Sequence, residues 1–144
     1  MSDKKYQIFI SSTFDDLQYE RRAALEAILI TNNIPIGMES FVASSQEQFE
    51  HIKSCIKGCD YYILIVGGRY GSQHPKLNLS YTELEFDYAK SLNKPILAFI
   101  RNDINKCRKK DTDLENISKF RTKVQQEHLC QLFNNKAELK GLVL

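Results

Sequence analysis

The sequence predicts an α/β protein built on a doubly wound, mainly parallel, five-stranded sheet. Short apolar runs alternate with amphipathic helical stretches along the whole chain. The runs are almost entirely apolar, which is typical of parallel strands that are covered on both faces. Two of them lead directly into turns rich in hydroxyl groups or glycine, the positions where such sheets bind ligands. With 144 residues, 42% of them hydrophobic, the chain is long enough for one domain with a substantial core.

Composition excludes several classes of function. The net charge of +2 gives no indication of nucleic-acid or membrane binding, and no apolar run reaches the roughly 18 residues of a membrane-spanning helix. The N-terminus lacks the features of a signal peptide. The four cysteines show no CxxC spacing and do not cluster with the histidines. We therefore expect no metal site, reduced thiols and a cytoplasmic location.

The first strand is predicted at residues 6–10, and a helix begins shortly after it. The turn between them carries three hydroxyl groups and an aromatic ring, on Ser11, Ser12, Thr13 and Phe14. Backbone N–H groups and hydroxyls in such a turn suit a phosphate or a sugar. The alternative is that Thr13 only caps the helix, with Asp16 as the acid of the capping box, and the acids of this turn would repel an anion.

The second strand is predicted at residues 34–38, with Glu39 at its carboxyl end. A lone acid after a strand is commonly just exposed, and the alternative, which this position supports, is contact with a ligand. The helix after it is predicted to begin at Ser45, with Gln48 completing a capping box, and to end at Gly58.

The most apolar run, at residues 61–66, is predicted to be the central strand. It leads into Gly67, Gly68, Arg69 and Tyr70, where glycine lets the backbone approach a ligand closely. Arg69 is expected to form a surface ion pair, to clamp a phosphate, or to pair with Glu85 of the next helix.

The next helix contains an acid on its apolar side. Ser80 is predicted as its N-cap, with Glu83 completing the capping box. Helical spacing places Glu85 among the apolar side chains, and Glu83 on the solvent side; that apolar side consists of Tyr81, Leu84, Tyr88, Ala89 and Leu92. Because a bare buried charge is costly, Glu85 either bonds to neighbouring backbone or lines a cleft as a catalytic carboxylate.

The remaining elements complete the sheet. We expect a fourth strand at 96–100, a helix across 114–124, an edge strand at 129–133 and a last helix at 137–144. Right-handed crossovers favour the flavodoxin-like strand order 2-1-3-4-5. The turns at 11–14 and 67–72 then meet at the point where the strand order reverses, and Glu85 faces the same crevice. One carboxylate facing a sugar suits cleavage of an N-glycosidic bond, because it stabilises or traps the ribosyl cation.

Four motifs in order resemble one branch of the TIR superfamily, a TIR-like domain of unknown function that opens with ISSTF. They are IFISSTFDDLQYER, IPIGMESF, CDYYILIVGGRYGS and SYTELEFDYAKSLNKPILAFI. The last is also distantly similar to a helix of nucleoside deoxyribosyltransferases. The resemblance implies a TIR-like core at residues 1–104, with residues 105–144 completing the same domain. It implies Glu85 as the catalytic glutamate, with Ala89 four positions later and Glu83 as the alternative register.

The resemblance implies NAD or a related nucleotide as substrate, with no separate cofactor and no metal. The residues expected to contact that substrate are Ser11, Ser12, Thr13, Phe14, Glu39, Gly67, Gly68, Arg69, Tyr70, Ser80 and Tyr81. It further implies immune or antiviral signalling, self-association, and NTPase or repeat domains in a longer parent protein. Three functions stay open: an NAD glycohydrolase, a non-catalytic self-association module, and a base-exchange enzyme of the deoxyribosyltransferase type.

Overall fold

The structure is a computed structural model, and it describes residues 5–14, 16–37, 46–102, 107, 110–128 and 130–143. The strands are β1 (Gln7–Ser11), β2 (Ile34–Gly37), β3 (Tyr61–Val66), β4 (Ile96–Arg101) and β5 (Cys130–Phe133). The helices are α1 (Gln18–Ile30), α2 (Gln46–Gly58), α3 (Tyr81–Ser91), α4 (Glu115–Glu127) and α5 (Lys136–Val143). The predictions for Glu39 and for the Ser45 cap lie outside the described residues.

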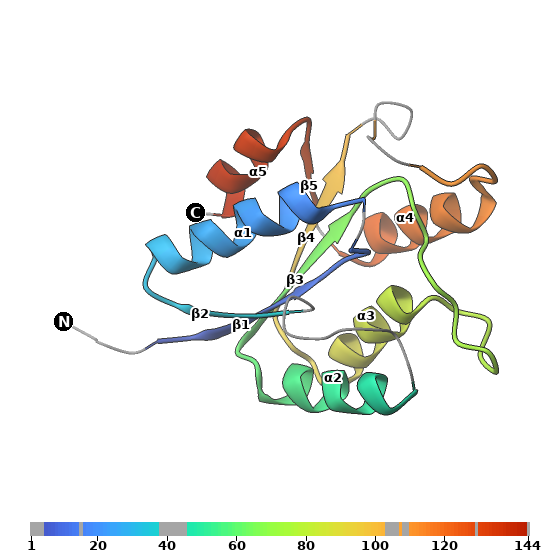
Figure 1. The fold of residues 1–144 in the computed structure, drawn as a ribbon, viewed down its shortest axis with the longest axis horizontal. Helices are drawn as coiled ribbons and strands as arrows, with labels where there is room; N and C mark the ends of the chain where they lie inside the picture. The colour runs from blue at the N-terminus through green and yellow to red at the C-terminus, as the bar shows by residue number, and fades with distance from the viewer. Residues whose placement is uncertain are drawn as a thin grey trace.

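The five strands form one parallel sheet in the order β2-β1-β3-β4-β5, which confirms the predicted fold class (Figure 1). Helices α1 and α5 cover one face of the sheet, and α2, α3 and α4 cover the other (Figure 1). Successive residues of a strand point to opposite faces, so Phe9 and Tyr62 pack toward α2–α4 while Ile10 and Ile63 pack toward α1. Both faces of the central strands are buried, which explains their unbroken apolar sequence.

The predicted start of α1 is wrong. Leu17 is the N-cap and no side chain caps it, so Thr13 and Asp16 form no capping box. The chain instead makes a tight turn, in which the Leu17 amide donates to the Phe14 carbonyl at 3.2 Å. The carboxyl of Asp16 is buried against Gly67 instead of facing the first turn of the helix.

Helix α3 buries more of its surface than an amphipathic pattern predicts. Phe86 is fully buried and packs on Phe120 of α4, while Leu84 and Tyr88 are only half-buried. Glu83, which was predicted to face solvent, is buried as well. The reason is that α3 is enclosed by the sheet, α2 and α4, so that tertiary packing covers the side assigned to solvent.

The N-cap of α3 agrees with its sequence only in part. The Ser80 hydroxyl accepts a hydrogen bond from the Glu83 amide at 3.1 Å, as predicted. The Glu83 side chain does not return to the cap, because it accepts from the Tyr70 hydroxyl at 2.5 Å and pairs with Lys123 at 2.8 Å. None of the helices in the described residues is long and apolar enough to cross a membrane.

Candidate active site

The carboxyl group of Glu85 lies inside the molecule at the carboxyl end of β1. Its residue is 2% exposed, in the first half of α3. The Ser11 hydroxyl, on the last residue of β1, donates to Glu85 Oε1 at 2.9 Å. The partner of this carboxyl is therefore a side chain of the predicted turn, and not the neighbouring backbone that the structural alternative had proposed.

Burial controls the ionisation of Glu85. Desolvation raises the pKa of its carboxyl from 4.5 to about 7, against the Ser11 hydrogen bond and the charge of Arg21, which both lower it. The neutral and charged forms are then both populated near neutral pH. A carboxyl in this state is suited to chemistry at pH 7, although buried structural carboxyls are shifted in the same way.

A buried arginine supports the turn after β1, and the sequence reasoning missed it. Arg21 of α1 is 1% exposed, and its guanidinium donates to the Ser12 hydroxyl at 2.9 Å and to the Ile10 carbonyl at 3.2 Å. Helical spacing places Arg21 on the same buried side of the helix as Leu17 and Ala24. Glu85 was identified because it is a charged residue among the apolar positions of a helix. The same pattern could have identified Arg21.

The other residues of this turn point in different directions. The Ser12 hydroxyl donates to the Thr13 carbonyl at 2.6 Å and is buried beside Arg21. The Thr13 hydroxyl is buried without a hydrogen-bond partner. Phe14 is 37% exposed, with its ring 5.8 Å from the Arg21 guanidinium carbon. Ser12 therefore supports the turn, and the Thr13 hydroxyl lies beside the buried Asp16 carboxyl, whose pKa is raised by burial and lowered by Thr13.

The turn after β3 is held by α4 and by the segment before it. The Gly67 carbonyl accepts from the Arg121 guanidinium at 2.9 Å, and the Gly68 carbonyl accepts from the Asp111 amide at 2.9 Å. Arg69 lies beside Asp111, with 3.9 Å between Nε and Oδ1. Of the roles predicted for Arg69, the surface ion pair is the one that the structure forms, and Asp111 takes the place proposed for Glu85.

Three further predicted contact residues have structural partners. Tyr70 is buried in the core, with its hydroxyl on Glu83 and its amide donating to Asp111 at 2.8 Å. Ser80 is the fully buried cap of α3. The ring of Tyr81 packs on His74 at 5.8 Å, and its amide donates to the Ser72 carbonyl at 2.9 Å. Among the predicted contact residues in the described ranges, Ser11 is the one hydrogen-bonded to Glu85.

Tyr62 is a second functional candidate that the sequence did not reveal. It is fully buried in β3, and its hydroxyl forms no hydrogen bond. Burial and the nearby charge of Glu85 raise the Tyr62 pKa well above its usual value of 10. The alternation of side chains along YYILIV predicts that one of the two tyrosines faces α3. It does not predict which residue of the neighbouring strand lies opposite that tyrosine.

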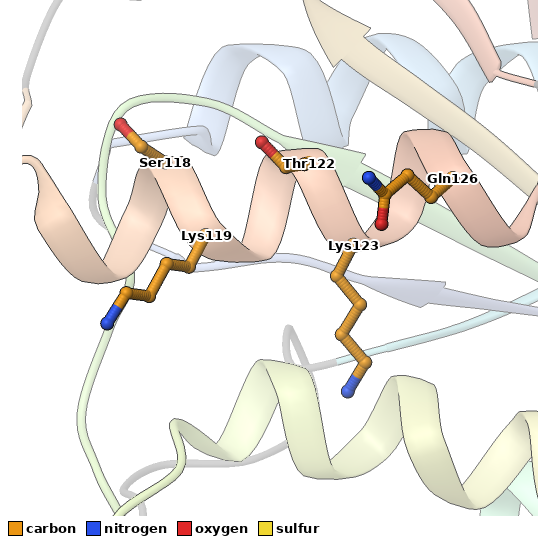
Figure 2. Close-up of a pocket in the computed structure, with 5 residues that line it drawn as sticks. All are labelled: Ser118, Lys119, Thr122, Lys123 and Gln126. Carbon is orange, nitrogen blue, oxygen red and sulfur yellow. The ribbon is translucent and has the colours of Figure 1, made fainter.

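A pocket of about 330 Å³ lies on α4. Its lining consists of Ser118, Lys119, Thr122, Lys123 and Gln126 (Figure 2). Figure 2 shows Lys123 reaching from α4 toward α3, where its ammonium pairs with Glu83 at 2.8 Å and Asp87 at 2.7 Å. These ion pairs fasten the two helices together. None of the predicted contact residues lines this pocket.

Within the described ranges, no group of three His, Cys, Asp or Glu side chains is placed to hold a metal ion. The groups gathered at the carboxyl end of β1 are a carboxyl, hydroxyls and a guanidinium.

The fold is shared with enzymes that act on nucleosides and nucleotides. The CMP N-glycosidase BcmB of Clostridium botulinum matches with a TM-score of 0.55 and 16% identity, over 96% of this chain and 99% of its own. A 2-desoxiribosyltransferase from Leishmania mexicana matches with a TM-score of 0.54 and 19% identity, over 96% of this chain and 97% of its own. At these identities the likeness establishes the architecture.

The sequence itself gives the family. This chain belongs to the family of the domain of unknown function DUF4062, which matches residues 7–143. No curated protein matches it significantly.

Proposed function

We propose that this domain cleaves the N-glycosidic bond of a nucleotide or nucleoside, with Glu85 as the carboxylate that acts on the sugar. The observation that carries the proposal is the buried Glu85 carboxyl, 2.9 Å from Ser11 Oγ at the carboxyl end of β1. In open α/β sheets, ligands bind outside the carboxyl ends of the strands where the order reverses. Here that place lies between β1 and β3, because the order is β2-β1-β3-β4-β5.

The chemistry requires one group of negative charge beneath the sugar. As the bond from the anomeric carbon to the base nitrogen breaks, positive charge develops on the ribosyl ring. A carboxylate there stabilises this charge or bonds to the carbon, and water then completes hydrolysis. NAD is a favourable substrate, because nicotinamide leaves as a neutral base and needs no strong acid. CMP, the substrate named for one protein of this fold, is the other candidate that we would test first.

The pKa and the burial of Glu85 set two conditions for cleavage. With a pKa of about 7, its charged form dominates only above neutral pH, so cleavage should become faster as the pH rises through 7. Since Glu85 is 2% exposed, substrate reaches it only when the side chains that cover it move aside. A positively charged nicotinamide ring near Glu85 would stabilise the charged carboxylate and lower its pKa, so that the charged form would be populated at a lower pH.

We extend the proposal to TIR-like signalling in immune defence, on the strength of the ISSTF and ELEFDYA motifs. Enzymes of this kind act after self-association, within longer proteins. An isolated, dilute domain would then be slow even though its chemistry is intact. Assays should therefore be run at high protein concentration.

The test is release of free base from a panel of NAD, CMP and nucleosides, separated by liquid chromatography. We expect at least one substrate to yield base with the wild-type domain and none to do so with Glu85→Gln. Absence of base release from every compound at high protein concentration would contradict the proposal and leave a non-catalytic association module, whose buried Glu85 is structural.

Transfer of the sugar to another base is the second candidate, favoured by the deoxyribosyltransferase of the same fold. Adding a free acceptor base to the same reactions separates the two. Hydrolysis alone gives the free sugar from a nucleoside, the sugar phosphate from CMP or ADP-ribose from NAD, whereas transfer produces a new nucleoside or nucleotide that carries the acceptor base.

A further inference from the structure

The hydroxyl of Tyr62 is a buried donor with no acceptor. Tyr62 is 0% exposed, and its ring stacks on Phe9 with 5.7 Å between centroids and 7° between planes. No hydrogen bond of ordinary geometry reaches the hydroxyl oxygen, although the Ser11 hydroxyl lies near enough to lower the Tyr62 pKa. A buried hydroxyl without a well-formed hydrogen bond destabilises the fold, so phenylalanine would be the more stable residue here unless the hydroxyl has a role.

Strand register brings this hydroxyl toward Ser11. On β1 and β3, Phe9 lies opposite Tyr62 and Ser11 lies opposite Leu64. Ser11 and Tyr62 therefore face the same side of the sheet, one step apart on neighbouring strands, which a tyrosine ring can span. Burial and the Glu85 charge raise the Tyr62 pKa and a hydrogen bond with Ser11 lowers it, which agrees with the register in placing both groups near the Tyr62 oxygen.

The hydrogen-bond donors and acceptors of Tyr62, Ser11 and Glu85 are compatible with one direction of donation, from Tyr62 through Ser11 to Glu85. A serine hydroxyl has one hydrogen and two acceptor lone pairs. Ser11 uses its hydrogen on Glu85 Oε1, so its lone pairs remain available. A charged Glu85 accepts only, and Tyr62 has a hydrogen to give.

We propose that, when Glu85 is charged, the Tyr62 hydroxyl donates to Ser11 Oγ while Ser11 donates to Glu85, which makes Tyr62 a positioning residue that stabilises the carboxylate. A hydroxyl that itself accepts a hydrogen bond is a stronger donor, so the relay strengthens the bond from Ser11 to Glu85. Its catalytic meaning rests on the proposed function, but the relay itself is measurable without any substrate.

Other titratable groups face this cluster and must stay constant in the test. Arg21 of α1 lowers the Glu85 pKa. Cys59, which follows α2, and Asp87 of α3 act on the Tyr62 hydroxyl, and both raise its pKa. Tyr62→Phe alters none of them and keeps the ring that stacks on Phe9. The neighbouring Tyr61, whose ring lies on Tyr6 at 5.5 Å and points to the opposite face, provides a matched control.

The experiment is an NMR titration of the Glu85 side-chain carboxyl carbon in the wild type, Tyr62→Phe, Ser11→Ala and the double variant. We expect Tyr62→Phe to raise the Glu85 pKa by about 1. Ser11→Ala should raise it by at least as much, and Tyr62→Phe should add nothing when Ser11 is absent. Tyr61→Phe should leave the pKa unchanged.

An unchanged Glu85 pKa in Tyr62→Phe would overturn the proposal, and so would an effect that survives in the Ser11→Ala background. In the wild type, the Tyr62 hydroxyl proton should follow the Glu85 titration, which needs no variant, and a proton that ignores it would also contradict the relay. If the relay is present but no base is released from any substrate, only the proposed function fails. If base is released without the coupling, only the relay fails.

Discussion

At the scale of the residue, the role that we propose for Glu85 lowers the stability of the folded protein. A carboxyl that is 2% exposed and has one hydrogen-bond donor from Ser11 is expensive to ionise. The same desolvation raises its pKa to about 7, and a buried carboxylate interacts strongly with a positive charge that develops beside it. A neutral side chain of the same shape should therefore fold better and lose the chemistry, as is common where function requires a buried polar group.

We predict that Glu85→Gln stabilises the protein above pH 7. The folded-state pKa, about 7, exceeds the ordinary value of 4.5, so the native state binds more protons between these values and wild-type stability falls as the pH rises across that window. At about 1.4 kcal/mol per pH unit, the difference amounts to about 3 kcal/mol at pH 8. Glutamine keeps an oxygen that accepts from Ser11. Urea unfolding of both proteins at pH 5 and pH 8 measures the effect.

The gain should shrink toward zero near pH 4, where wild-type Glu85 is neutral in both states. A stability difference that does not depend on pH would show that Glu85 ionises normally. The charge-dependent part of the mechanism would then have no basis.

Of the buried groups at this site, the sequence identified Glu85 and Ser11 and missed Arg21 and Tyr62. Glu85 stood out because its position on α3 was compared with the apolar side chains around it. Arg21 lies on the buried side of α1 in the same way, but long side chains often reach solvent from such positions, which hid it. Tyr62 could not be recognised, because its role depends on the β1–β3 register and on an absent hydrogen bond, and neither is encoded locally.

At the scale of elements, two loops are fitted against each other above the sheet. Gly71 has φ +93°, and a Cβ added there would meet Thr13 Cγ2 at 2.8 Å. Here glycine is needed both for the backbone conformation and for the approach of the turn after β1. This contact fixes the spacing of the loops that follow β1 and β3.

Gly71→Ala should lower the free energy of unfolding by about 1–3 kcal/mol, since alanine is strained at positive φ and displaces Thr13. Chemical denaturation measures the loss. Gly58→Ala, at the end of α2 with no heavy atom within 4 Å of the added carbon, is the matched control and should be nearly neutral. Equal effects of the two substitutions would show that the loops do not depend on this contact.

Lys123 joins α4 to α3 through two carboxylates. Its partner Glu83 has a side chain only 10% exposed, so losing the ammonium leaves a nearly buried charge with the Tyr70 hydroxyl as its remaining bond. Lys123→Met keeps the length of the side chain and should cost about 2 kcal/mol in thermal or urea unfolding.

Lys119→Met one turn earlier removes a pair with Glu115 in which both side chains are largely exposed, 72% and 66%. It should cost about 0.5 kcal/mol or less. If Lys123→Met were as mild as this control, the ion pairs between α3 and α4 would contribute nothing to holding Glu85 in place.

At the scale of the whole molecule, the topology could be predicted because few arrangements satisfy a strand–helix alternation. Right-handed crossovers and continuous apolar strands leave little choice beyond the observed order β2-β1-β3-β4-β5. The faces of the helices were less predictable. Leu29 keeps helical spacing with the buried Ala24 and Ile28 of α1 but is 55% exposed, and Glu83 was predicted to face solvent but is buried. Which side of a helix is covered depends on neighbours that are distant in sequence, as α4 is for α3.

The central claim is that Glu85, and no other acid of α3, acts on the sugar. The most direct measurement is the initial rate of base release by Glu85→Gln and by Glu83→Gln, compared with the wild type at saturating substrate and high protein concentration. Both substitutions neutralise a buried acid on the same helix. We predict a loss of about 10³-fold or more for Glu85→Gln and a rate within about tenfold of the wild type for Glu83→Gln. Equal rates for wild type and Glu85→Gln, or a loss confined to Glu83→Gln, would contradict the account.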